Sequence, residues 1–145
     1  MPEKQTIERA REDAREGKSP STQAGEFVRE EFHHVREGKH GARSPQQAIA
    51  IGLSKARRAG VKLGPPKGSA SLRKKAAEDP TAGKKPHHKT SRTRSSAVSG
   101  ALKREPKSSA SHAAISKQAK RSATKRGPRA RSAAAVKAAH TRKAA

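Results

Sequence analysis

Histidine side chains near the N-terminus are the residues of this chain best suited to metal chemistry. His33 and His34 are adjacent, His40 follows six residues later, and His87 and His88 form a second pair. Zinc ligands must converge on one point, whereas adjacent side chains on a helix point about 100° apart. We therefore expect these histidines to face solvent or lie at helix ends, and we expect no metal site and no cofactor.

Two other motifs bear a weaker likeness to catalytic sites. Residues 17–19 read Gly-Lys-Ser, as at the end of a phosphate-binding loop, but the earlier glycine of that loop is Glu12 here and no strand precedes it. Glu30 and Glu31 are neighbours on a helix and need not form a general acid/base pair. The chain also has no Cys and no Tyr. We expect no catalytic residues and no enzyme.

The composition points to a polyanionic partner. The chain has 145 residues, a net charge of +23 and a pI near 11.6, and only 30% of it is hydrophobic and 1% aromatic. Such charge favours binding to nucleic acid, an anionic membrane or an acidic protein. The absence of Cys excludes disulfides and fits a reducing cytoplasm, and no apolar run is long enough to span a membrane. We expect a cytoplasmic protein located on the nucleoid.

The charge is unevenly placed along the chain. Residues 1–38 hold 7 Lys/Arg and 9 Asp/Glu, a net charge of −2, whereas residues 39–145 hold 28 Lys/Arg and 3 Asp/Glu, a net charge of +25. From residue 80 onward there are 18 Lys/Arg and a single acid, Glu105. Low hydrophobicity with high charge is typical of disorder, because little apolar surface is available to offset chain entropy.

Three helices are expected before this basic region. Segments 6–17 and 22–38 each place apolar residues at helical spacing and end in glycine, with Thr22 as the N-cap of the second. Segment 44–60 begins with Ser44 as N-cap, followed by proline and then by a glutamine that completes a capping box, and it too ends in glycine.

The predicted fold is a small all-α domain of three short helices over residues 1–65, followed by a long intrinsically disordered, Lys/Arg/Ala/Ser/Pro-rich basic tail over residues 66–145. The predicted core of the helical head is thin: Ile7, Phe27, Val28, Phe32, Val35, Ile49, Leu53, Val61 and Leu63. Small domains bury proportionally little surface, so we expect the head to self-associate through Ala48, Gly52 and Ala56.

The third helix is interpreted in two ways. It is either the base-reading helix of a helix-turn-helix or a packing helix whose solvent face contacts phosphates. The preceding turn is longer than that motif requires, and among the early residues only Gln46 and Gln47 could read bases. The second interpretation is favoured, with helix-packing residues Ala48, Ile49, Gly52, Leu53 and Ala56.

The basic residues are expected to bind duplex DNA through its phosphates. The tail has no Phe, Tyr or Trp on which single-stranded bases could stack. The candidate phosphate-binding residues are Lys55, Arg57, Arg58, Lys62, Lys84, Lys85, Arg92, Arg94, Lys103, Arg104, Lys117, Lys120, Arg121, Lys125, Arg126, Arg129, Arg131, Lys137, Arg142 and Lys143. If about half of the tail's cations engage, the log-log salt slope would be roughly −8.

One stretch of the head also resembles a known family. Residues 30–63 (EEFHHVREGKHGARSPQQAIAIGLSKARRAGVKL) resemble short basic bacterial and phage proteins of unknown function, some of which are labelled as plasmid stabilisation proteins. The most telling part is QAIAIGLSKARRAGVKL (47–63), and the resemblance extends back through SPSTQAGEFVRE (19–30). The resemblance covers about residues 1–65 and implies no catalytic residues. The tail is similar in composition to the basic tails of histone H1 and bacterial histone-like proteins.

The sequence therefore predicts a sequence-independent DNA-binding protein, nucleoid-like or plasmid-associated, that binds mainly through its tail. Two alternatives stay open. The same charges could bind RNA or the ribosome, or the nearly neutral head could dock onto a protein partner while the tail serves as a tether.

Overall fold

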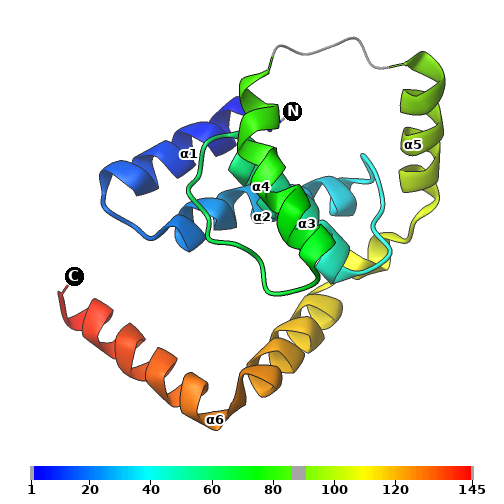
Figure 1. Ribbon diagram of the computed structural model, residues 1–145. Coiled ribbons are helices and arrows are strands. Elements are labelled where there is room, and N and C mark those ends of the chain that lie inside the picture. Colours follow the sequence, from blue (N-terminus) through cyan, green and yellow to red (C-terminus); the bar gives the residue numbers. More distant parts are fainter. Residues whose placement is uncertain (1, 86–90, 145) are drawn as a thin grey trace. The chain divides into compact units, whose positions relative to one another are not determined.

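The computed structural model describes residues 2–85 and 91–144, and the regular secondary structure of these residues is all helical, with no strand (Figure 1). The elements are α1 (Lys4–Arg15), α2 (Pro20–Glu37), α3 (Pro45–Arg58), α4 (Ala70–Lys84), α5 (Arg92–Arg104), the 3-10 turn η1 (Lys107–Ala110) and α6 (His112–Ala144). The contacts divide the chain into two compact units, Met1–Ala110 and Ser111–Ala145.

The expected fold of three helices and a long disordered tail is wrong. Helices α4, α5 and α6 occupy most of the segment expected to be disordered. The reason is intrinsic helix propensity: residues 111–145 contain 12 alanines, the residue that favours helix most, besides lysines, arginines and a glutamine. Low apolar content alone predicts disorder here, but helix formation depends on this local preference as well.

The first three helices form where capping chemistry predicts them. Ser44 Oγ accepts a hydrogen bond of 3.3 Å from the Gln47 backbone N–H, and Pro45 is the first helical residue of α3. The N-cap predicted for α2 is wrong: Ser19, not Thr22, caps the helix, and its Oγ accepts from the Thr22 N–H at 3.4 Å. Pro20 therefore starts this helix, as a proline at the first position can.

Left-handed glycines close these three helices. Gly17, Gly38 and Gly60 follow α1, α2 and α3 with φ angles of 74°, 78° and 98°. A side chain is strained in this conformation, so glycine is the residue that lets the chain turn away there. The predicted helix ends are confirmed to within two residues.

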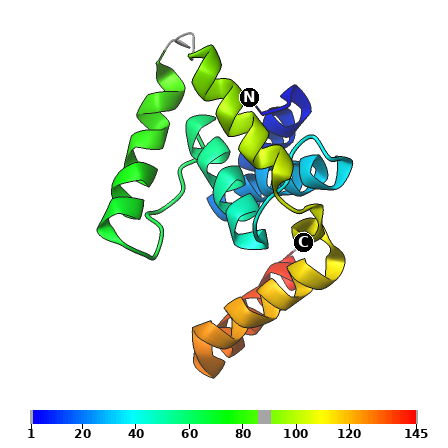
Figure 2. The same cartoon turned by 90° about the vertical axis from the view of Figure 1, so that its right-hand side faces the viewer.

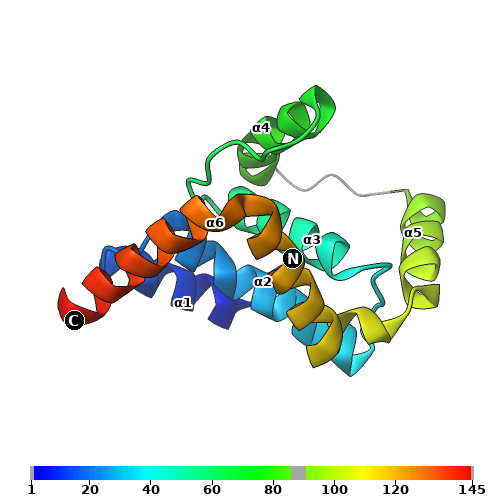
Figure 3. The ribbon, with the colours of Figure 1, turned by 90° about the horizontal axis from the view of Figure 1, so that it is seen from below.

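Helix α2 lies at the centre of the first unit. It packs against α1 on one side and α3 on another, and α3 in turn packs against α4 (Figures 2 and 3). Phe27 and Val35 of α2 are fully buried and Phe32 is nearly so. The core cluster consists of Ala10, Ala24, Phe27 and Ala56, with Ile7, Leu53, Val61 and Leu63 packed partly buried against it.

Small residues let α3 approach α2 closely. Ala48 and Ala56 are fully buried, and a Cβ atom built on Gly52 would lie 2.7 Å from the Val28 Cα atom. The stripe of Ala48, Gly52 and Ala56 is therefore covered within the chain. It is not an exposed surface on which a second copy could dock, which corrects the expected self-association through these residues.

Within the first unit, hydrogen bonds to backbone carbonyls join the segment from α5 to η1 to α2 and the loop after it. The structure describes every residue of α5 (Arg92–Arg104), and none of these residues is buried. The Gly41 N–H donates to the Leu102 carbonyl at 2.8 Å, the Ala42 N–H donates to the Pro106 carbonyl at 3.3 Å, and Arg36 Nε donates to the Ala110 carbonyl at 2.9 Å. These bonds fix the loop between α2 and α3 as well as η1.

The second unit consists of α6 alone. Gly127 interrupts this helix with φ 79° and ψ 167°, just before Pro128, so α6 bends there into two helical arms (Figure 1). None of the described helices of the chain is long and apolar enough to cross a membrane.

The tight α2–α3 approach gives a first prediction. The Gly52→Ala substitution forces a Cβ atom against the backbone of Val28, and we expect it to lower the free energy of unfolding by about 1–2 kcal/mol despite the better helix propensity of alanine. Gly25→Ala in α2 is the control, because a Cβ atom there meets nothing within 4 Å and should stabilise by about 0.5–1 kcal/mol. Urea unfolding of both variants measures the difference. Equal effects would contradict the close approach.

Candidate functional site

A buried carboxylate stands at the centre of a polar network between α2 and α3. The Glu31 side chain is 0% exposed, and neither of its oxygens has a hydrogen-bond partner among the residues that the structure describes. The ammonium of Lys55, on α3, forms an ion pair with its Oε1 atom. A buried charge without such a partner would be strongly destabilising, so Lys55 is essential to this arrangement.

Lys55 joins α3 to two adjacent carboxylates of α2. Its Nζ atom donates to Glu30 Oε1 at 3.1 Å besides the ion pair with Glu31, and its side chain is 21% exposed. Burial alone lowers the pKa of Lys55, but the interactions of its ammonium with the carboxylates of Glu31 and Glu30 outweigh burial and raise this pKa above its usual value.

Glu30 ties the start of α1 to the same network. Its Oε2 atom accepts a hydrogen bond of 3.1 Å from the Glu3 backbone N–H. Burial raises the pKa of Glu30, but the hydroxyl of Thr6, the Glu3 N–H and the Lys55 ammonium together lower it below its usual value. The ionised form of Glu30 is thus favoured by the fold.

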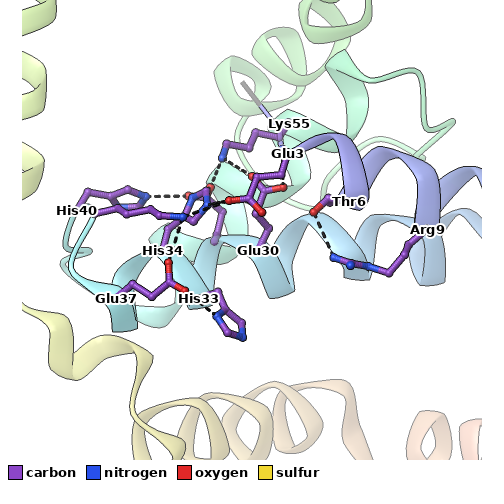
Figure 4. A network of polar contacts seen from close by, with 11 residues as sticks. Glu3, Thr6, Arg9, Glu30, His33, His34, Glu37, His40 and Lys55 are labelled. Atoms are coloured by element: carbon purple, nitrogen blue, oxygen red, sulfur yellow. Dashed lines mark hydrogen bonds and ion pairs between the residues drawn. The ribbon is translucent and has the colours of Figure 1, made fainter.

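Two histidines from different segments, His34 and His40, lie near Glu3 and Lys55 in this network (Figure 4). Both approach the buried carboxylate of Glu31. His34, on α2, places Nδ1 3.7 Å from Glu31 Oε1, and its Nε2 lies 2.9 Å from Glu3 Oε1. His40, in the loop after α2, places Nε2 3.5 Å from Glu31 Oε2, and its Nδ1 lies 3.0 Å from the Gly41 carbonyl oxygen. The two ring centroids are 6.0 Å apart and the rings are nearly perpendicular, at 81°.

The outer edge of the network is exposed and ionic. Glu3 accepts from His34 and from Lys39 Nζ, at 3.2 Å, and these two hydrogen bonds lower the pKa of Glu3 to about 2. Lys39 also pairs with Glu37 at 3.1 Å, and His33 lies 3.4 Å from the other Glu37 oxygen. His33 is 59% exposed and has no contact with the buried carboxylate.

The convergence of Glu31, His34 and His40 was missed by the sequence analysis. Their potential ligand atoms all lie within 4.8 Å of one another. The signal in the sequence was the three-residue spacing of Glu31 and His34, which places both on one face of a helix, rather than the adjacent pair of histidines. The second adjacent pair, His87 and His88, lies outside the described residues.

The Gly-Lys-Ser stretch at 17–19 is a helix junction. Lys18 Nζ forms ion pairs with Asp13, at 2.8 Å, and with Glu16, at 2.6 Å, which together raise its pKa. Ser19 caps α2. The lysine is therefore engaged with carboxylates of its own chain.

The three basic residues of α3 in the predicted phosphate-binding set are also engaged inside the chain. Lys55 pairs with the two buried carboxylates described above. Arg57 is only 9% exposed and donates to the Gly64 carbonyl at 3.3 Å, and Arg58 Nε donates to Asp79 Oδ1 on α4 at 2.9 Å. α3 thus uses its cations to hold neighbouring segments.

The remaining predicted phosphate-binding residues are all exposed. In the first unit these are Lys62, Lys84, Lys85, Arg92, Arg94, Lys103 and Arg104. In the second unit they are Lys117, Lys120, Arg121, Lys125, Arg126, Arg129, Arg131, Lys137, Arg142 and Lys143. Residues 111–145 contain these ten cations and no Asp or Glu.

Comparison with known proteins identifies a protein family. Residues 15–68 match a protein family described as "Family of unknown function (DUF6496)". This stretch, from the end of α1 to just past α3, is similar to that family, whose description names neither an activity nor plasmid stabilisation, and no histone-like relative is found. No curated protein and no solved structure gives a significant match.

The buried ion pair gives a second prediction. Lys55→Ala leaves Glu31 buried without a counter-charge, so we expect it to lower the free energy of unfolding by about 2–3 kcal/mol. Lys62→Ala, which removes an exposed lysine, is the control and should change stability by less than about 0.5 kcal/mol. Chemical denaturation at pH 7 checks both. A Lys55→Ala variant as stable as the control would show that Glu31 does not depend on this ammonium.

A third prediction concerns acid stability. Because the pKa of Glu30 is lower in the folded protein than its usual value, its ionised form stabilises the fold at neutral pH. This contribution is lost as the pH falls below the usual value and through the folded-state pKa. Glu30→Gln should therefore destabilise by about 1–2 kcal/mol at pH 7 and by much less at pH 3.

Unfolding of wild type and Glu30→Gln at the two pH values measures this difference. Glu8→Gln, at an exposed position of α1, is the matched control and should show little effect at either pH. A Glu30→Gln effect independent of pH would argue against stabilisation by the ionised carboxylate.

Proposed function

We propose that the protein binds duplex nucleic acid independently of sequence, through phosphate contacts made by the basic side chains of α6. The observation that carries the proposal is the composition and exposure of the second unit. All ten of its Lys and Arg residues are exposed, and it contains no acidic residue to neutralise them. Such a surface binds polyanions through counterion release.

The first unit differs because its carboxylates engage several of its cations. All 12 Asp and Glu residues of the chain lie within residues 1–110. Ion pairs join Arg9 to Glu26 at 2.6 Å and Arg58 to Asp79 at 2.9 Å, and Lys55 pairs with buried carboxylates. A cation already paired with a carboxylate gains less from a phosphate than an unpaired one does. The second unit is therefore the stronger phosphate-binding surface.

Helical spacing places several of these cations on one side of α6. Lys117, Arg121 and Lys125 follow one another at intervals of four residues, with Lys120 beside them. The stretch from the first to the last of the three spans about 12 Å of helix axis. Duplex DNA carries one phosphate charge per roughly 1.7 Å, so about seven phosphates lie along the same length. Each cation can thus contact a phosphate whatever the position of α6 along the duplex.

The residue types favour a duplex over unpaired bases. Proteins that bind single strands commonly stack bases on aromatic side chains. The two aromatic residues of this chain, Phe27 and Phe32, are buried in the first unit. Binding independent of sequence along a duplex is the kind of interaction expected of a nucleoid-associated protein.

The fourth prediction is a reduced salt dependence of binding. Replacing Lys117, Lys120, Arg121 and Lys125 with Gln removes up to four phosphate contacts. The log-log salt slope on random duplex DNA should become shallower by roughly 3–4, with a loss of affinity that is the same for unrelated sequences. Fluorescence anisotropy of the full-length protein at several salt concentrations measures both.

A variant with the same change in charge serves as control. It replaces four exposed cations of the first unit with Gln: Lys4, Arg11, Arg15 and Arg29. This variant should retain a slope close to that of wild type. Equal loss in both variants would show that net charge alone matters and would overturn the assignment to α6. Stronger binding to structured RNA than to DNA of equal length, maintained as salt rises, would assign the protein to RNA instead.

A further inference from the structure

We propose that Glu31, His34 and His40 form a binding site for a divalent transition-metal ion of the zinc class. The three come from α2 and from the loop that follows it, and their potential ligand atoms lie within 4.8 Å of one another. Two imidazoles and one carboxylate are a known ligand set for zinc, with one coordination position left for water.

The hydrogen bonds of the two histidines present unprotonated ring nitrogens to Glu31. The Gly41 carbonyl can only accept, so His40 Nδ1 carries the proton of that bond and Nε2, facing Glu31 Oε2, has a lone pair in the neutral ring. The Glu3 carboxylate likewise accepts from His34 Nε2, which leaves the Nδ1 lone pair directed at Glu31. Two lone pairs facing a buried carboxylate repel it unless a cation lies between them.

The separations match those between ligands of one metal ion. His34 Nδ1 and His40 Nε2 lie 3.7 Å and 3.5 Å from the oxygens of Glu31, which is too long for good hydrogen bonds. With metal–ligand bonds of 2.0–2.1 Å and tetrahedral angles, neighbouring ligand atoms are about 3.3 Å apart. The Glu31–His40 separation is within a few tenths of an ångström of that value, and side-chain rotations would have to bring His34 Nδ1 into the same range, since the three ligand atoms lie within 4.8 Å of one another.

The outer contacts of the site are those that metal-binding histidines usually have. Such histidines donate their second N–H to a carboxylate or a backbone carbonyl, as His34 does to Glu3 and His40 does to Gly41. The loop that carries His40 is itself fixed by the backbone hydrogen bond from Gly41 to Leu102. Lys55 pairs with Oε1 of Glu31, so Oε2 remains for the ion.

The local charge favours a divalent cation. The ion-paired network contains four carboxylates, of Glu3, Glu30, Glu31 and Glu37, and two ammonium groups, of Lys39 and Lys55. With neutral imidazoles its net charge is −2, which one divalent ion brings to zero. Nitrogen ligands select zinc-class ions over Ca²⁺ and Mg²⁺, which prefer oxygen.

The test is a titration of the full-length protein with Zn²⁺ in competition with a chromophoric chelator. It is done at pH 8, where an ordinary imidazole is neutral. We expect one ion per chain, and a loss of affinity of about 100-fold or more in His40→Ala and in His34→Ala. His33→Ala, which removes the adjacent exposed histidine, should bind as tightly as wild type. The double variant His87→Ala/His88→Ala should also bind normally, which excludes the other adjacent pair.

Outer contacts provide a test that leaves all three ligands in place. Glu3→Gln should weaken Zn²⁺ binding by about 10–100-fold, whereas Glu37→Gln, with the same change in charge beside the non-ligand His33, should not. Co²⁺ in place of Zn²⁺ should give the intense visible absorption of a four-coordinate ion, absent in His40→Ala. Circular dichroism of every variant verifies that the helices are retained.

Zinc should also stabilise wild type against heat. At saturating Zn²⁺ the melting temperature should rise on the order of 5 °C in wild type and His33→Ala but not in His40→Ala, while Mg²⁺ has no effect. Retention of wild-type affinity in a folded His40→Ala variant would overturn the proposal. Failure of wild type to compete with the chelator would overturn it as well.

Discussion

The burial of the Glu31 carboxylate is the constraint on which the rest of the first unit depends. A fully buried charge is tolerated only with a counter-charge close by, and α3 supplies it with Lys55. This ammonium can reach the carboxylate because Gly52, one turn earlier on α3, lets the two helix backbones come close. Close packing and ion pairing are therefore two parts of the same interface.

The same carboxylate organises the segments around it. His34 and His40 face it from α2 and from the following loop, and Glu3 at the start of α1 contacts both His34 and Glu30. In consequence four parts of the chain meet at one polar centre (Figure 4). Polar centres of this kind are costly when incomplete, which is the physical reason to look for a cation at this one.

Charge is divided unevenly between the two units. The first unit contains all of the acidic residues, and it uses them to pair with cations of α1, α3 and the loops. In the second unit all of the charged residues are Lys or Arg, and all of them are exposed. The basic residues thus have two roles in one chain. In the first unit, those paired with carboxylates stabilise the fold, and in the second unit they remain available to a polyanion.

Local chemistry made the first three helices readable from the sequence alone. N-cap serines, first-turn prolines and left-handed glycines influence only the few residues next to them. The ends of α1, α2 and α3 were therefore predicted to within two residues in most cases. The exception is the N-cap of α2, which is Ser19 and not Thr22. The basic charge and the scarcity of aromatic residues are likewise properties of composition. The helical state of α4 to α6 was missed, although alanine content, a local property, indicated it.

Only the tertiary structure decided which charged residues are engaged. Lys55 and Arg58 looked like phosphate-binding residues and proved to pair with Glu31 and Asp79, because their partners lie more than twenty positions away. His40 looked solvent-facing for the same reason: its position opposite Glu31 follows from the path of a loop held by distant backbone bonds. Ion pairs between helices depend on how the helices pack, and the spacing of residues along one helix does not specify that packing.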